Sequence, residues 1–236
     1  MFAKVKDGLG WYFARVMAVI TLLARVNGSR VFVMGDSHTL IFQRRAGVIS
    51  RHLGPITLNR FGRDGEAKAL FNSAFSWPRR LRWIPFPMPT ASDFPVLSFG
   101  EIDIRVHVDR ISREQSMEPS KVINGLVDSA ISGLHQLREA TGARLVFLGP
   151  PPPVNEFYDE KYPTGGSFRE RVTWMNELKF GLSNRIYEIS DGMMFFVDIA
   201  NQYETLDGGL NKNFSDGTVH YKKEIGAQFL AEILSL

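Results

Sequence analysis

The sequence has no cysteine among its 236 residues. Disulfide bonds, thiolate metal ligands and cysteine nucleophiles are therefore excluded, and a nucleophile would have to be another residue type. An excess of charge of one sign is also missing, because 28 basic residues face 25 acidic ones and leave a net charge of +3. So weak an excess does not predict a partner as strongly anionic as nucleic acid.

Long hydrophobic runs are missing as well. The apolar run over residues 16–24 ends at Arg25, whereas a membrane-spanning helix needs about 20 apolar residues. No small-residue cleavage site follows it, so an amphipathic helix within residues 1–29, packed on a domain core of residues 30–236, is favoured over a targeting segment. We expect one domain over residues 1–236, with no stable membrane span and a cytoplasmic location.

Apolar residues make up 44% of the chain, enough to build a sizeable core. Several short runs are continuously apolar, which is typical of parallel strands buried on both faces. Amphipathic stretches with helical spacing separate these runs. The expected strands are 31–34, 95–99, 145–148 and 193–197, with 56–58 as a weaker candidate, and the expected helices are 64–75, 120–141, 167–189 and 222–234.

The alternation of strands and helices predicts an α/β fold: a three-layer α/β/α sandwich around a mainly parallel, five-stranded sheet. Gly142 and Ser120 have the residue types expected of a C-cap and an N-cap for the helix at 120–141. In such folds, sites lie at the carboxyl ends of the strands.

A candidate nucleophile stands at one such strand end. The apolar run 31–34 leads into Gly35-Asp36-Ser37-His38, a strand-to-loop turn that would place Ser37 at the carboxyl edge of the sheet. A serine hydroxyl is a poor nucleophile unless a base takes its proton and nearby dipoles receive the developing oxyanion.

A candidate base lies near the other end of the chain. His220 comes just before the last expected helix, and Asp216 precedes it by four residues. An acid and a histidine this close can share one turn, so that the carboxylate fixes the imidazole tautomer while the other ring nitrogen faces the serine.

Gly35-Asp36-Ser37 after the first strand, with Asp216 and His220 before the last helix, resembles the first and last motif blocks of the SGNH/GDSL hydrolases. The resemblance implies a flavodoxin-like fold and an activity among the esterases, lipases, thioesterases and carbohydrate deacetylases. It implies Ser37 as nucleophile, His220 as base and Asp216 as the orienting acid, with no cofactor. A nucleotide cofactor is not indicated either, because the sequence has no glycine-rich phosphate loop.

The resemblance also implies residues around the oxyanion. Gly62 stands in the region of the second motif block, whose glycine N–H helps to bind the oxyanion. Asp36 would brace the loop of the nucleophile, and His38 and Asp103 are further candidates for the substrate-binding site.

The third motif block departs from the family. Gly100-Glu101-Ile102-Asp103 has isoleucine where the Gly-x-Asn-Asp pattern has its oxyanion-binding asparagine. Losing one such donor can cost roughly 10²- to 10³-fold in rate. Arg105 is a possible substitute donor or a clamp for an anionic substrate. Similar Gly-Glu-Ile-Asp-x-Arg segments occur in SGNH-like proteins linked to polysaccharide biosynthesis, which suggests an ester on a sugar or polysaccharide as substrate.

Two alternatives stay open. The family usually has two residues between the acid and the histidine, whereas Asp216 and His220 have three. With the missing asparagine, this suggests a catalytically altered protein that binds a glycan. A metal-dependent phosphoesterase is the other alternative, because Asp36-x-His38 after a strand resembles the opening motif of that class. Its remaining ligands would come from Asp103, His107 and His220.

Overall fold

The computed structural model describes residues 29–43, 45, 47–76, 89–155, 163–189 and 191–236. The helix expected within residues 1–29 falls almost wholly outside the described residues. None of the described helices is long and apolar enough to cross a membrane.

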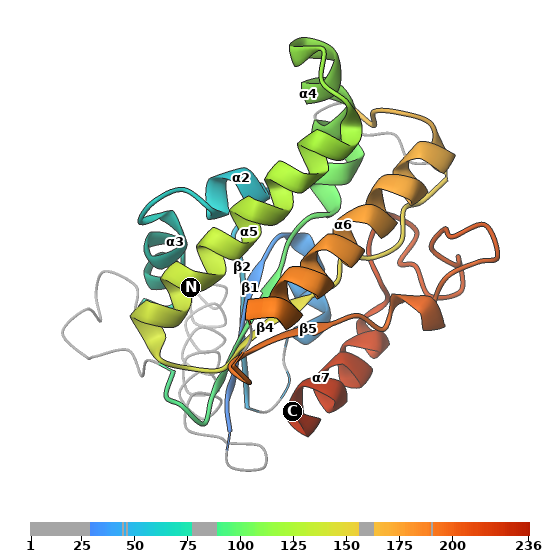
Figure 1. Ribbon diagram of the computed structural model, residues 1–236. Coiled ribbons are helices and arrows are strands. Elements are labelled where there is room, and N and C mark those ends of the chain that lie inside the picture. Colours follow the sequence, from blue (N-terminus) through green and yellow to red (C-terminus); the bar gives the residue numbers. More distant parts are fainter. Residues whose placement is uncertain (1–28, 44, 46, 77–88, 156–162, 190) are drawn as a thin grey trace, which may run out of the picture.

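The five strands of the sheet run parallel in the order β2-β1-β3-β4-β5 (Figure 1). This is the flavodoxin-like order, in which the direction of strand addition reverses between β1 and β3. The sequence therefore predicts the α/β class and the parallel sheet correctly. The strands are β1 (Val31–Gly35), β2 (Val48–His52), β3 (Phe94–Ser98), β4 (Leu145–Leu148) and β5 (Met194–Val197).

Helices cover both faces of the sheet and make the three expected layers (Figure 1). Alternate residues of β1 show the division, because Phe32 and Met34 enter one core cluster while Val31 and Val33 enter the other. The first cluster is covered by α2 (Leu58–Phe61), α3 (Glu66–Ala74), α5 (Pro119–Thr141) and α6 (Phe168–Ile189), and the second by η1 (Ser37–Phe42) and by η5 (Lys223–Ile225) with α7 (Gly226–Ser235).

The long helix α5 ends as the sequence predicts and begins one residue earlier. Gly142 is its C-cap in the left-handed conformation, with φ of 63°, which glycine adopts without steric cost. Glu118 rather than Ser120 is the N-cap, and Pro119 takes the first helical position. Proline suits that position because the amide it lacks has no partner inside the helix.

The second strand is the main error of the sequence interpretation. In the weak candidate at 56–58, residues 56 and 57 are loop and Leu58 begins α2, and the real edge strand is β2. Only Val48 and Ile49 of β2 are buried apolar residues, while Arg51 and His52 are exposed. An edge strand with a polar end lacks the continuous apolar run by which the other strands were recognised.

The segment after β3 holds two elements that the sequence did not predict. A π-helical turn, η3 (Asp103–His107), leads into α4 (Val108–Gln115), which projects beyond the end of the sheet (Figure 1). π-Helical turns occur often at functional sites.

Glycine-to-alanine changes in α5 test how closely α2 packs on it. A Cβ at Gly133 would lie 2.3 Å from the ring of Phe61, whereas one at Gly125 would meet nothing within 4 Å. We expect Gly133→Ala to lower the free energy of unfolding by about 1–3 kcal/mol through overpacking. Gly125→Ala should raise it by up to about 1 kcal/mol through helix propensity. Urea denaturation of both variants checks this, and equal effects would contradict the close contact.

Candidate active site

The turn after β1 positions the candidate nucleophile. A Cβ at Gly35 would lie 2.1 Å from the carbonyl oxygen of Ser98, so only glycine allows β1 and β3 to approach this closely. The N–H of Asp36 donates to the same carbonyl at 3.2 Å. The Asp36 carboxylate then caps η1 by accepting from the His38 N–H at 3.0 Å. Ser37 thus begins a short helix at the carboxyl end of β1.

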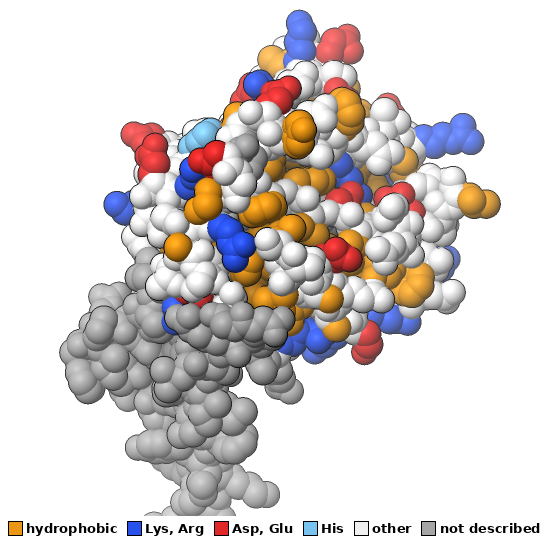
Figure 2. Space-filling model, turned by 60° about the horizontal axis from the view of Figure 1, so that its bottom comes forward, with side chains coloured by type: hydrophobic (Ala, Val, Ile, Leu, Met, Phe, Trp, Pro, Cys, Tyr) orange, Lys and Arg blue, Asp and Glu red, His pale blue; other side chains and the backbone are white. Residues whose placement is uncertain are grey.

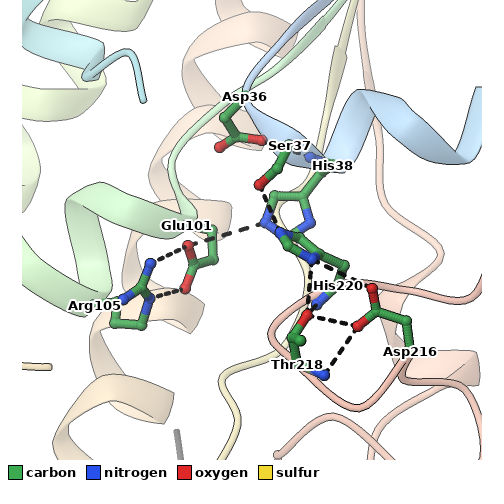
Figure 3. A network of polar contacts seen from close by, with 8 residues as sticks. All are labelled: Asp36, Ser37, His38, Glu101, Arg105, Asp216, Thr218 and His220. Atoms are coloured by element: carbon green, nitrogen blue, oxygen red, sulfur yellow. Dashed lines mark hydrogen bonds and ion pairs between the residues drawn. The ribbon is translucent and has the colours of Figure 1, made fainter. Parts of the chain in front are cut away.

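The structure brings His220 to this serine from a distant part of the chain. The Ser37 hydroxyl lies 2.6 Å from Nε2 of His220, although 183 residues separate them in the sequence (Figure 3). This is hydrogen-bonding distance for a serine and its general base. In the tautomer with the proton on Nδ1, Nε2 is free to accept the hydroxyl proton.

Nδ1 of His220 faces two groups, the carboxylate of Asp216 and the hydroxyl group of Thr218. Asp216 Oδ2 is 3.4 Å from His220 Nδ1, which is longer than an ordinary N–H···O hydrogen bond. Thr218 Oγ1 is closer, at 2.8 Å from the same nitrogen, and donates to Asp216 Oδ1 at 2.6 Å (Figure 3). Asp216 also accepts from the Thr218 N–H at 2.9 Å.

Burial lowers the pKa of His220, and the charge of nearby His38 lowers it further against the opposing effect of Asp216. A base with a lowered pKa stays neutral, and so able to accept a proton, in mildly acidic solution. The pKa of Asp216 is also lowered, because the hydrogen bonds from Thr218 outweigh its partial burial. The pair therefore carries a neutral imidazole and a charged carboxylate at neutral pH.

A buried charged cluster lies next to the pair of Ser37 and His220 (Figure 3). The His38 ring packs edge-on against His220, with the ring centroids 4.9 Å apart, and its Nε2 lies 4.0 Å from a carboxylate oxygen of Glu101. Glu101 is bound in turn by Arg105, with Nε 2.6 Å from Oε1 (Figure 3). Burial opposes a charge on His38, but the carboxylates of Asp36 and Glu101 outweigh it and raise the pKa of His38.

Arg105, expected as an oxyanion donor or as a clamp for an anionic substrate, is paired with Glu101 in this cluster. Its guanidinium forms an internal ion pair with Glu101, and both side chains are about nine-tenths buried. Burial favours the neutral carboxyl, yet His38 and Arg105 hold the pKa of Glu101 below its usual value. The charge of Arg105 is therefore largely balanced within the protein.

Asp103 anchors the helix α2 to the segment after β3. Its carboxylate accepts from the N–H of Leu58 at 3.0 Å, and the residue is fully buried. Burial, helped by the nearby carboxylates Asp36 and Glu101, raises the pKa of Asp103 to about 8. Asp103 is thus largely protonated at neutral pH. Its hydrogen bond with the Leu58 N–H joins the start of α2 to the segment after β3.

The expected oxyanion donors are only partly assembled. The N–H of Gly62 donates to the carbonyl of Leu58 at 2.9 Å, and a Cβ on Gly62 would lie 2.3 Å from the carbonyl oxygen of Ser129 on α5. The Gly62 N–H is therefore bonded within α2, and the missing side chain lets α2 pack closely on α5. The side chain of Ile102 is buried and has no donor. Within the described residues, the Ser37 N–H has no protein acceptor, so it is available to an oxyanion.

The ligand set expected for a metal is not brought together. Among the described residues, no group of three histidine or acidic side chains is placed to hold a metal ion. His107 lies on η3, where its Nδ1 is 3.2 Å from Arg110. The described geometry therefore does not support the metal-dependent phosphoesterase.

Comparison with known proteins finds similarity in structure alone. No protein-family model and no curated protein match the sequence. A solved structure from Streptococcus pneumonia, described provisionally as a platelet activating factor, has 12% identity, covers 99% of both chains and has a TM-score of 0.58. An acylhydrolase from Bacteroides fragilis, also a provisional description, has 16% identity, covers 94% of this chain and 92% of that one, and has a TM-score of 0.55.

The chain therefore shares the fold of these two structures, and its parallel, five-stranded sheet is the α/β architecture that the sequence predicts. In this chain, the turn after β1 and the segment before α7 meet at the carboxyl end of β1, where Ser37 contacts His220. The sequence interpretation did not identify two residues near this pair, Thr218 and Glu101, as site residues. Thr218 had a recognisable signal, since it is a hydroxyl residue between Asp216 and His220. Glu101 had only its spacing of four from Arg105.

The raised pKa of Asp103 predicts a pH-dependent stability. Between about pH 4 and about pH 8 the folded protein keeps a proton that the unfolded chain has released, so this residue lowers stability as the pH rises. Asp103→Asn removes that titration and keeps an oxygen acceptor for the Leu58 N–H. We therefore expect the variant to gain stability relative to wild type as the pH rises through this range. Urea midpoints at several pH values measure the difference, and a constant difference would refute the buried neutral carboxyl.

Proposed function

We propose that this protein is a serine ester hydrolase or acyl transferase in which Ser37 is the nucleophile, His220 the general base and Asp216 the acid that orients it. The observation that carries the proposal is the 2.6 Å contact between the Ser37 hydroxyl and Nε2 of His220 at the carboxyl end of β1. The SGNH fold supports it, because the provisionally described acylhydrolase shares that fold.

The proposed reaction follows from this contact. Ser37 Oγ attacks the acyl carbonyl carbon while His220 Nε2 takes its proton, and the carbonyl oxygen becomes an oxyanion. The imidazolium then protonates the leaving alcohol, and an acyl-enzyme remains on Ser37. Water completes a hydrolysis by attacking this ester, whereas a second alcohol completes an acyl transfer.

Oxyanion binding in this proposal rests first on the backbone N–H of Ser37. The side chain at position 102 adds no donor, and the Gly62 N–H is already bonded within α2. Since one lost donor can cost roughly 10²- to 10³-fold in rate, we expect slow turnover of simple esters unless the substrate brings further contacts.

An O-acylated sugar or polysaccharide is the substrate class we propose. A cavity of about 1290 Å³ adjoins the base-bearing segment at Thr218. Several asparagine side chains line this cavity. An amide group can donate and accept hydrogen bonds at the same time, as a hydroxyl-rich ligand requires. The lining includes Asn155, Asn201, Asn211, Asn213, Thr205 and Phe168.

The second candidate is a glycan-binding protein with little or no catalytic activity. The observation that favours it is the incomplete set of oxyanion donors at Ile102 and Gly62. Nucleic acid is a less suitable polymer, because basic and acidic side chains are interspersed on the face shown in Figure 2. Both candidates use the same cavity, so they differ in whether Ser37 is reactive.

Covalent labelling tests the nucleophile without knowledge of the substrate. We expect a fluorophosphonate probe to add once to the wild type and not to Ser37→Ala, as read by intact mass. His220→Ala should label about 10²- to 10⁴-fold more slowly because no base takes the proton. His135→Ala, which changes an exposed histidine on α5, is the matched control and should label as wild type does. An unlabelled but folded wild type would favour the glycan-binding protein.

The substrate class predicts a preference among acetyl esters. Acetate release from a partly acetylated xylo-oligosaccharide should exceed that from ethyl acetate at equal concentration, because amide groups in the cavity can bind the sugar hydroxyls. Asn211→Ala should raise KM for the saccharide and leave the rate of fluorophosphonate labelling unchanged. A variant with unaltered KM would argue against saccharide binding in this cavity.

A further inference from the structure

The segment that carries the acid and the base is a tight turn with one residue more than the family pattern. Ser215 and Tyr221 pair as an antiparallel bridge, and the Asp216 N–H donates to the His220 carbonyl at 3.0 Å. Gly217 has φ of 97°, which a residue with a side chain rarely adopts. Val219 is buried, whereas the side chains of Thr218 and His220 both lie against Asp216.

The hydrogen-bond directions in this turn are fixed by chemistry. An ionised carboxylate can only accept, so the Thr218 hydroxyl must donate its proton to Asp216 Oδ1 at 2.6 Å. The lone pairs of Thr218 Oγ1 are then free to accept from His220 Nδ1–H at 2.8 Å. With the proton on Nδ1, Nε2 accepts from Ser37 at 2.6 Å. All three bonds therefore run in one direction, from the serine to the acid.

We propose that Thr218 is a positioning residue that links Asp216 to His220 through its hydroxyl group and holds the imidazole in the tautomer that can accept the proton of Ser37. This inference rests on the function proposed above. The direct contact of Asp216 Oδ2 with Nδ1 is 3.4 Å, 0.6 Å longer than the 2.8 Å contact made by Thr218. The nearest acceptor for the Nδ1 proton is thus the hydroxyl.

The linkage needs no proton transfer beyond Ser37 and His220. The Ser37 proton moves to Nε2, the Nδ1 proton stays on the ring, and the Thr218 proton stays on the hydroxyl. When the imidazole becomes positive, both hydrogen bonds behind it strengthen, because each joins a more polarised donor to its acceptor. Asp216 thereby stabilises the imidazolium through the hydroxyl group of Thr218.

Two variants of Thr218 separate the hydroxyl group from the shape of the side chain. Thr218→Val keeps the branched shape and removes the hydroxyl, and Thr218→Ser keeps the hydroxyl. We expect Val to slow fluorophosphonate labelling of Ser37 about ten- to hundredfold, as for the loss of a hydrogen bond linked to a charged group. The labelling rate of Thr218→Ser should stay within about threefold of that of the wild type, because the hydroxyl is kept but the serine side chain rotates more freely. In a plot of labelling rate against pH, the acid limb of Thr218→Val should lie at lower pH than that of the wild type.

Measurement of the ring tautomer keeps this test independent of catalysis. Nitrogen NMR of His220 should show the Nδ1–H form in the wild type and in Thr218→Ser, with a larger share of Nε2–H in Thr218→Val. If the wild type is not labelled, the proposed function fails, yet the tautomer result still decides the role of Thr218. Unchanged labelling and tautomer in a folded Val variant would overturn the inference.

A double variant tests whether the acid acts through the hydroxyl. If Asp216 and Thr218 work as one unit, Asp216→Asn combined with Thr218→Val should slow labelling no more than the slower of the two single variants. Multiplied effects in the double variant would show that Asp216 acts on His220 by a separate route, and that result would also overturn the inference.

Discussion

The site depends on the close approach of β1 and β3 at Gly35. A Cβ there would lie 2.1 Å from the Ser98 carbonyl oxygen, and that oxygen also accepts the N–H of Asp36. Without a side chain at position 35, the chain can leave the sheet in a sharp turn that Asp36 caps through His38. Ser37 therefore projects from the point where the strand order reverses, which is the usual ligand site of open parallel sheets.

The proposed base, His220, is held against this turn by packing in the second core cluster. A Cβ at Gly226, at the start of α7, would lie 2.2 Å from the carbonyl oxygen of Ile41 in η1. The helix that carries the nucleophile and the helix after the base therefore touch backbone to backbone. Tyr221, next to His220, is buried against Phe229 of α7. The segment that carries His220 is thus held by packing contacts outside the proposed reacting pair.

The sequence predicts those parts of the fold that a continuous pattern marks. The strands β1, β3, β4 and β5 and the long helices are found because each is a run of one periodicity, and the edge strand β2 is missed because its apolar run is only two residues long. Ser37, His220 and Asp216 stand out by residue type and place. The contacts of Gly62 with Ser129 and of Arg105 with Glu101 could not be predicted, because they depend on where the folded chain places these residues.

The two sides of the reacting centre are unequally equipped. Three hydrogen bonds in one direction join Ser37, the proposed base and Asp216, whereas the side chain of Ile102 offers an oxyanion no donor and the Gly62 N–H is bonded within α2. Stabilisation of the oxyanion is usually the largest single contribution to acyl transfer. Such a site gains most from a substrate that brings its own donor. A sugar hydroxyl next to the ester group can reach the carbonyl oxygen, and this is a physical reason why an O-acylated saccharide fits the proposed chemistry better than a simple alkyl ester.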